Sequence, residues 1–120
     1  MEYRYFGNTG LKISCITFGA QTFGWNIDEK EAHELLDYYE ASGGNYIDIA
    51  DSYNQGDSER IVGTWFKKRG NRERFIIGTK VFFSTGDSVN DTGLSRKHIF
   101  HSMSESLDRL GTDYIDLYQM

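Results

Sequence analysis

The sequence predicts an α/β fold in which short parallel strands alternate with helices. Segments with the period of an amphipathic helix lie between short apolar segments that have the length of strands. The strand centres are about thirty to forty residues apart, which is the size of a βαβ unit, and they lie near Cys15–Ile16, Ile47, Ile77 and Ile115. This alternation produces a parallel sheet with right-handed crossovers. Two architectures fit: a doubly wound open sheet, or part of a (β/α)8 TIM barrel.

A short β-hairpin precedes these units. The segment "RYFGNTGLKIS" predicts a strand at Tyr3–Phe6, a turn over Gly7–Gly10 and a return strand at Leu11–Ser14. The next apolar run, Cys15–Phe18, ends at Gly19 and is expected to be the first strand of the parallel sheet. Later strands are expected at Asn45–Ile49, Arg74–Phe82 and Asp113–Tyr118.

Local signals mark the ends of the helices. Asp28 is a suitable N-cap with Glu31 three residues later, and Ser95 is a suitable N-cap for the last helix. Glycines follow the helices at Gly43–Gly44, Gly70 and Gly111, where they end the helical pattern. The apolar positions expected to face the core include Leu35, Leu36, Tyr39, Trp65, Phe66, Ile99, Met103, Leu107 and Leu110.

Composition limits the class of protein. The 120 residues suit one domain or part of one, and we expect a single unit over 1–120 without a linker. The net charge of −5 argues against binding to nucleic acid or anionic lipid, although basic residues cluster between Lys67 and Arg74. The sequence has neither a long apolar run nor a signal peptide, so we expect a cytoplasmic protein. Cys15 has no intrachain partner and is expected in the core.

Three ionisable side chains lie where two neighbouring strands are expected to end. Asp48 lies near the end of one strand, Tyr53 lies on the following loop, and Lys80 lies near the end of the next strand. In both architectures, functional side chains gather at the carboxyl ends of parallel strands. Buried charges are costly unless they are paired, so these groups are expected to pair with one another.

This set of side chains suits proton transfer to a carbonyl oxygen. A free phenol has a pKa of about 10, too high for an efficient proton donor near neutrality. A neighbouring ammonium stabilises the phenolate, and a carboxylate behind the ammonium keeps it charged and oriented. Two other interpretations remain open. Asp48 and Lys80 could form a purely structural ion pair, or Lys80 could attack a carbonyl group as in a Schiff-base aldolase.

The segment "GNYIDIADSYNQGDSERIVG" at 44–63 resembles the signature of the aldo-keto reductase family. The resemblance extends over nearly the whole chain, because further family-like segments follow in order: "TGLKIS", "FGAQTFG", "IIGTKVF", "GLSRKHI" and "SLDRLGTDYIDLYQM". The segment "GLSRKHI" is similar to the branch that contains potassium-channel β subunits and related bacterial aldehyde reductases.

The resemblance implies the N-terminal half of a (β/α)8 barrel, preceded by the hairpin. It implies an NADPH-dependent oxidoreductase that reduces small aldehydes or ketones. Tyr53 would be the general acid, Lys80 the group that adjusts its acidity, and Asp48 the partner of the lysine. The resemblance places Gly19, Ala20 and Gln21, together with Asp48, near the nicotinamide end of NADPH. No metal site is expected from the residues themselves, because His98 and His101 are one helical turn apart but have no evident third ligand.

In similar reductases a fourth catalytic residue, a histidine, follows the segment that ends here at Met120. We therefore expect an N-terminal fragment that is inactive alone, from a full-length protein that could be a homo-oligomer. Besides the Schiff-base aldolase, the resemblance leaves open a non-enzymatic, channel-associated or redox-sensing subunit that retains this site.

Overall fold

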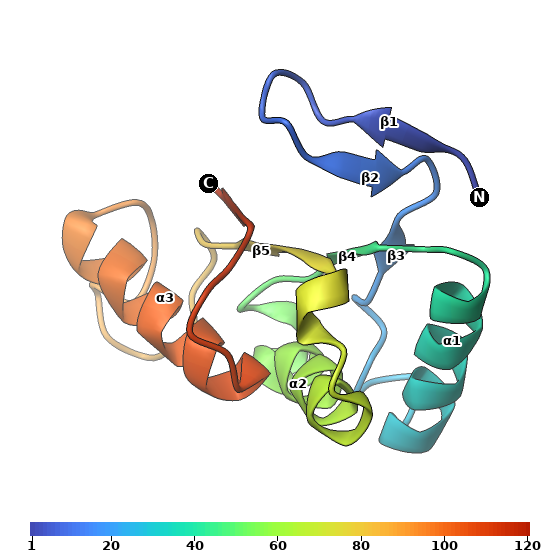
Figure 1. Ribbon diagram of the computed structural model, residues 1–120. Helices are drawn as coiled ribbons and strands as arrows, with labels where there is room; N and C mark the ends of the chain where they lie inside the picture. The colour runs from blue at the N-terminus through green and yellow to red at the C-terminus, as the bar shows by residue number, and fades with distance from the viewer.

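The chain forms a four-stranded parallel sheet with helices on one face, and a hairpin on the other side lies at the amino-terminal end of the strands (Figure 1). The structure, a computed structural model, describes residues 1–120. The hairpin strands are β1 (Tyr3–Tyr5) and β2 (Lys12–Ser14), and the sheet has the order β3 (Phe18–Gly19), β4 (Tyr46–Asp48), β5 (Ile76–Lys80) and β6 (Leu117–Gln119). The helices are α1 (Glu29–Ala41), α2 (Asp57–Arg69) and α3 (Arg96–Leu110), with short 3-10 turns η1 (Tyr53–Gly56) and η2 (Arg72–Arg74).

The order of the strands decides between the two architectures that the sequence allowed. The four strands lie side by side in chain order and all pair in parallel. Figure 1 shows α1, α2 and α3 on the same side of the sheet. A doubly wound sheet reverses its strand order and carries helices on both faces, whereas a barrel winds in one direction with all helices outside. The sheet is therefore a segment of a barrel wall.

The core fills the space between the sheet and the helices. It is a cluster of 14 buried residues, to which the strands contribute Ile47 and Ile77 and helix α2 contributes Trp65. Because side chains alternate along a strand, Ile47 and Ile77 face the helices, while Tyr46 and Asp48 face the opposite side. The opposite face corresponds to the interior of the barrel, and it carries the polar groups described below.

The hairpin is fixed to the amino-terminal end of β4. The ring of Phe6 stacks on that of Tyr46, with centroids 6.4 Å apart. The Asn45 side chain accepts a hydrogen bond from the Ser14 amide at 2.7 Å and donates one to the Lys12 carbonyl at 2.9 Å. The hairpin therefore covers one end of the sheet and leaves the carboxyl ends of the strands accessible.

The caps that the sequence predicted are confirmed. The Asp28 carboxylate accepts a hydrogen bond from the Glu31 amide, and the Ser95 hydroxyl accepts one from the His98 amide. Helix α3 ends at Gly111, which adopts a left-handed conformation with φ of 64°. None of the helices has both the length and the apolar character that crossing a membrane requires.

The first strand of the sheet begins later than predicted. The expected strand at Cys15–Phe18 is wrong, because β3 comprises only Phe18 and Gly19. The Cys15 amide continues the hairpin by bonding to the Glu2 carbonyl, and the Ile16 carbonyl accepts a hydrogen bond from the Tyr39 hydroxyl. Cys15 is exposed, so the prediction that it belongs to the core is also wrong.

Strands β5 and β6 are both shorter than predicted. The last strand is β6 at Leu117–Gln119 rather than Asp113–Tyr118. The Asp116 carboxylate accepts the hydrogen bond from the Ile77 amide, at 2.8 Å, that a longer strand would have accepted through its backbone. Strand β5 begins at Ile76, since η2 forms a turn of 3-10 helix where a strand was expected.

Two helical faces also differ from the prediction. Leu35 is exposed, whereas Leu36 next to it is buried. In α3 the buried face includes His98, Ser102 and Ser106, which are polar, while the predicted core residues Ile99, Met103 and Leu107 are only half-buried. The face of α3 toward the sheet is therefore used for hydrogen bonding as well as for apolar packing.

We predict that Gly63→Ala destabilises the fold, because α2 and α3 meet backbone to backbone at this residue. A Cβ atom there would lie 2.5 Å from the Arg109 carbonyl oxygen and 2.8 Å from that of Leu110. Overpacking of this kind costs about 1–3 kcal/mol, which exceeds the gain of about 1 kcal/mol in helix propensity. Urea unfolding measures the loss. Exposed Lys67→Ala in the same helix is the control, with a change within about 0.5 kcal/mol. A Gly63→Ala variant as stable as the parent would contradict the prediction.

Candidate active site

The candidate active site lies on the inner face of the sheet, at the carboxyl ends of β4 and β5. Asp48 pairs with Gly78 in the sheet register, and Lys80 lies two residues further along β5 on the same face. The Lys80 side chain therefore points to the side on which the Asp48 carboxylate lies. Tyr53 enters from the loop after β4, at the start of η1.

The ammonium group of Lys80 connects the three side chains. Its Nζ donates to Asp48 Oδ2 at 2.8 Å, to the Ile49 carbonyl oxygen at 2.8 Å and to the Tyr53 hydroxyl oxygen at 3.1 Å. The same Nζ lies 4.7 Å from the centroid of the Tyr53 ring. A lysine ammonium has three N–H donors, and here each donor has one acceptor. The geometry is that of a fixed, charged amine.

The direction of these hydrogen bonds leaves the proton of Tyr53 free. Because the phenolic oxygen accepts a hydrogen bond from Lys80, its own O–H can point away from the lysine toward a ligand. The positive charge beside the oxygen stabilises negative charge that would develop there when the proton leaves. The arrangement can therefore donate a proton to a bound oxygen atom.

A run of left-handed residues holds Tyr53 in place. Asn54 and Gln55 have φ angles of 49° and 55°, and Gly56 follows with 87° before α2 begins. For residues other than glycine this conformation costs about 1–2 kcal/mol each. The Tyr53 amide also donates to the Ala50 carbonyl at 3.2 Å. The chain therefore reverses sharply after Tyr53, and the ring points back toward Lys80.

A cavity of about 340 Å³ opens beside Tyr53 and Lys80. Its walls combine these two polar side chains with the rings of Phe82 and Phe83 and with Gln119. This volume lies at the small end of the range for ligand pockets, about 300–1,000 Å³. A small molecule with one polar oxygen and an apolar body fits such walls.

The residues at the end of β3 and just after it differ in their exposure next to this region. Gly19 is exposed, and a Cβ atom there would have no neighbour within 4 Å. Gln21 is exposed and lines a shallow hollow with Tyr53 and Trp25. Ala20 is fully buried, and its amide bonds to the Asp48 carbonyl while its carbonyl accepts from the Ser58 hydroxyl. Gly19 and Gln21 are therefore accessible to a ligand, whereas Ala20 fixes the segment to the scaffold.

Sequence reasoning missed a buried polar network behind the site, on the helix face of the sheet. The Glu59 carboxylate is fully buried and accepts hydrogen bonds from Thr79 at 2.6 Å and from Arg109 at 2.6 Å. Ser102 donates to Asp51 Oδ2 at 2.8 Å, and both residues are 2% exposed. The helical spacing of Ser102 and Ser106 was the available signal, because polar residues there interrupt an otherwise apolar face.

Asp51 is a titratable group of this network whose environment disfavours its charge. Burial raises the pKa of Asp51, and the nearby Glu59 carboxylate adds to the effect. The hydrogen bond from Ser102 and the charge of Arg109 oppose it. Asp51 also lies two residues before Tyr53, on the loop that carries the phenol.

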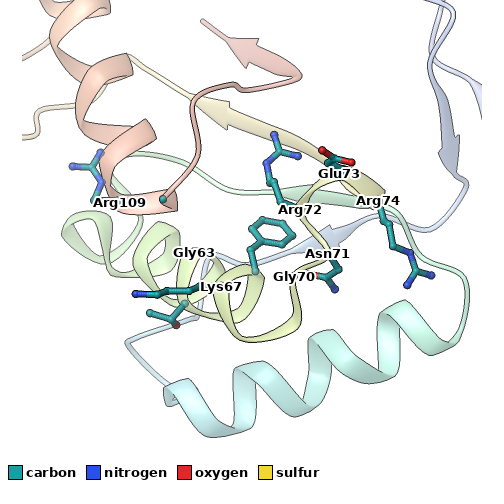
Figure 2. Close-up of a pocket in the computed structure, with 11 residues that line it drawn as sticks. Gly63, Lys67, Gly70, Asn71, Arg72, Glu73, Arg74 and Arg109 are labelled. Carbon is teal, nitrogen blue, oxygen red and sulfur yellow. The ribbon is translucent and has the colours of Figure 1, made fainter.

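A larger cavity, of about 700 Å³, lies at the opposite end of the sheet and is lined by part of the basic cluster, Lys67, Arg72 and Arg74 (Figure 2). Figure 2 shows Arg72 and Arg74, from the turn before β5, and Arg109, from α3, around it. Each guanidinium is paired with a carboxylate: Arg72 with Asp116, Arg74 with Glu40 and Arg109 with Glu59. The positive charges of these arginines are therefore neutralised within the chain.

Residues 15–120 match the Aldo/keto reductase family. Protein tas of Escherichia coli (strain K12) is 40% identical over 134 aligned residues, which include 100% of this chain and 38% of that protein. A probable voltage-gated potassium channel subunit beta of Arabidopsis thaliana is 42% identical over 98% of this chain and 36% of its own length. The aldo-keto reductase AKR11C1 from Bacillus halodurans, in its holo form, has a TM-score of 0.83 at 38% identity, over 99% of this chain and 39% of its own.

The matched residues include the whole parallel sheet and all three helices, so the fold and the sequence agree on one class of protein. The chain belongs to the aldo/keto reductase family. Its likeness to AKR11C1 confirms the predicted fold class, the N-terminal half of a (β/α)8 barrel, and the relatives confirm the resemblance to the potassium-channel β branch. The chain spans 38% of the length of protein tas and 39% of that of AKR11C1.

We predict that Asp51→Asn raises the thermal stability of the polypeptide that carries this chain at pH 7. The pKa of Asp51 is higher in the folded chain than in the unfolded chain, so the unfolded chain loses this proton at a lower pH. The free energy of unfolding therefore decreases as the pH rises above about 4. Asparagine keeps an acceptor for Ser102 without the charge. We expect an increase in Tm of about 2–5 °C at pH 7, which shrinks as the pH falls toward 4. Asp87→Asn, at an exposed residue, is the control. An equal increase at both pH values would contradict the prediction.

Proposed function

We propose that residues 1–120 form one continuous part of the barrel of an NADPH-dependent reductase, and that they carry most of its proton-transfer site. The observation that supports this most directly is the set of three hydrogen bonds from Lys80 to Asp48, Ile49 and Tyr53. Membership of the aldo/keto reductase family supports the class of reaction. The reaction would convert small aldehydes or ketones to alcohols.

The residues around the cavity fit a nicotinamide cofactor. Gly19 leaves open space beside the end of β3, and the exposed Gln21 side chain offers an amide for hydrogen bonding. Asp48, whose carboxylate lies on the same inner face, closes this side of the site. The family's nicotinamide cofactor, when bound, supplies the hydride that reduces the carbonyl carbon. Residues of this chain would orient the carbonyl group and supply the proton.

Tyr53 would be the general acid in this reaction. Its O–H is not needed for the contact with Lys80 and can point into the cavity, where a carbonyl oxygen would accept the proton as the carbon is reduced. Lys80 would stabilise the phenolate that remains, because its ammonium already donates to the phenolic oxygen. Asp48 would keep Lys80 charged and fixed through their 2.8 Å ion pair.

The residues that line the cavity favour small carbonyl compounds as the substrate class. Phe82 and Phe83 offer apolar surface opposite the polar pair, and their rings lie edge to face with centroids 5.5 Å apart. An aldehyde or ketone has one acceptor oxygen for Tyr53 and an apolar body for the rings. A charged or highly hydroxylated compound would leave its polar groups without partners on the aromatic side.

The contacts of Lys80 argue against a Schiff-base aldolase. Attack on a carbonyl needs a neutral amine with a free lone pair, whereas the ion pair with Asp48 favours the charged ammonium. A channel-associated or redox-sensing subunit is the second candidate, supported by the relative named as a probable potassium channel subunit beta. Such a subunit would keep the nucleotide site while turning over carbonyl substrates far more slowly than ordinary enzymes.

We predict that Tyr53→Phe abolishes most carbonyl reduction in the complete polypeptide that carries this chain. Loss of a general acid lowers kcat by about 10²–10⁴-fold, and we expect NADPH binding, measured by fluorescence quenching, to change little. The readout is NADPH oxidation with a small aldehyde. Tyr38→Phe is the matched control because Tyr38 is 76% exposed, and it should keep parental activity.

Two outcomes of this experiment, and one separate trapping experiment, distinguish the candidate functions. A Tyr53→Phe variant with parental kcat would exclude Tyr53 as the acid. A parent that binds NADPH but shows almost no turnover would favour the sensor subunit. A covalent adduct on Lys80, trapped with a carbonyl compound and sodium borohydride, would favour the aldolase.

A further inference from the structure

Gln119 makes a contact that spans three strands of the sheet. Its side chain starts on β6, crosses β5 and donates from Nε2 to Asp48 Oδ1, on β4, at 2.9 Å. Neighbouring strands are about 4.8 Å apart, so β4 and β6 are separated by about 10 Å. Side chains from β4 and β6 can therefore meet only where the β5 residue between them has a small side chain or none.

Gly78 provides that room. It pairs with Asp48 on one side and with Leu117 on the other, on the inner face of the sheet. A Cβ atom on Gly78 would lie 3.1 Å from Gln119 Nε2 and would press on the Tyr46 hydroxyl. The absence of a side chain at this residue therefore creates the path along which Gln119 reaches Asp48.

With this contact, each oxygen of the Asp48 carboxylate accepts a hydrogen bond from a different side chain. Oδ1 accepts from Gln119, and Oδ2 accepts from Lys80 at 2.8 Å. With both oxygens bonded on different sides, rotation of the carboxylate would break at least one hydrogen bond. The Gln119 backbone is itself fixed, because its carbonyl accepts from the Val81 amide at 3.0 Å.

We propose that Gln119 is a positioning residue, which holds the Asp48 carboxylate so that the Lys80 ammonium is directed at Tyr53, with Gly78 as the residue that permits the contact. This inference rests on the proposed function of the Tyr53 site. Gln119 acts through Asp48 and Lys80. Its loss should therefore change the chemical step more than substrate binding.

Two substitutions in the complete polypeptide test this role. Gln119→Met keeps the length of the side chain but removes the amide donor, and we expect kcat to fall about tenfold, the effect of one charge-assisted hydrogen bond, while KM changes less than twofold. Gln119→Glu can donate to Asp48 only when the new carboxyl is protonated. We expect near-parental kcat below about pH 6 and loss of activity above it, since two carboxylates at this distance disfavour double ionisation.

The pH profile separates positioning from general damage to the fold. Asn90→Asp, on an exposed loop, adds the same charge and should leave the profile unchanged. Circular dichroism melts identify any variant that fails to fold. A Gln119→Met variant with parental kcat, or a Gln119→Glu profile parallel to the parental one, would overturn the proposal.

A second readout keeps this test independent of reductase activity. The acetylation rate of Lys80 by acetic anhydride, mapped by mass spectrometry, reports how firmly the ammonium is held. We expect Gln119→Met to raise this rate at least threefold relative to other lysines, whether or not the parent reduces carbonyls. If the parent shows no reduction, the proposed function fails. The acetylation rate of Lys80 then tests the positioning role alone. A faster rate in Gln119→Met would support it, and an unchanged rate would overturn it.

Discussion

The ammonium group of Lys80 constrains the carboxyl end of the sheet, because each of its three donors meets a single acceptor. A half-buried charge in this position is tolerated only when its partners are fixed. The parallel register of β4 and β5 supplies two of them, Asp48 and the Ile49 carbonyl. The loop after β4 supplies the third, Tyr53. The register of the sheet, the reversal after Tyr53 and the cavity beside it therefore depend on one another.

The opposite face of the same strands carries a second set of charges that supports the first. Thr79 lies between Gly78 and Lys80 on β5 and points to the helices, where it bonds to the buried Glu59 of α2. Arg109 of α3 completes the pair with Glu59 at 2.6 Å. Removing one member of a buried pair costs about 3–5 kcal/mol. The network thus fixes α2 and α3 to the strand that presents Lys80.

The sequence allowed much of this arrangement to be predicted, because its signals are local. The N-caps Asp28 and Ser95 lie at the start of their helices, and the alternation of strands and helices is enough to indicate a parallel sheet. Asp48 and Lys80 could be expected to lie close together, because both lie near the ends of adjacent parallel strands. These inferences need only the order of elements along the chain.

The features that could not be predicted depend on contacts between distant residues. The start of β6 depends on the Asp116 carboxylate, which bonds to the Ile77 amide from 39 positions away. Gln119 meets Asp48 only because the register pairs Asp48 with Gly78 and Gln119 with Lys80, so that the Gln119 side chain passes over Gly78. The exposure of Cys15 follows from the hairpin continuing to Glu2. Periodicity along the sequence does not contain this information.

The alternation of side chains along β5 has an evolutionary consequence. Ile77 and Thr79 face the helices, whereas Gly78 and Lys80, which alternate with them, face the inner side of the sheet, where the proposed proton-transfer site lies. If the proposed function holds, mutations at neighbouring codons of this strand would be subject to different selective pressures, one acting on folding yield and the other on turnover. A mutant library that diversifies only the inward-facing positions could explore new chemistry on this scaffold while leaving the helix-facing packing unaltered.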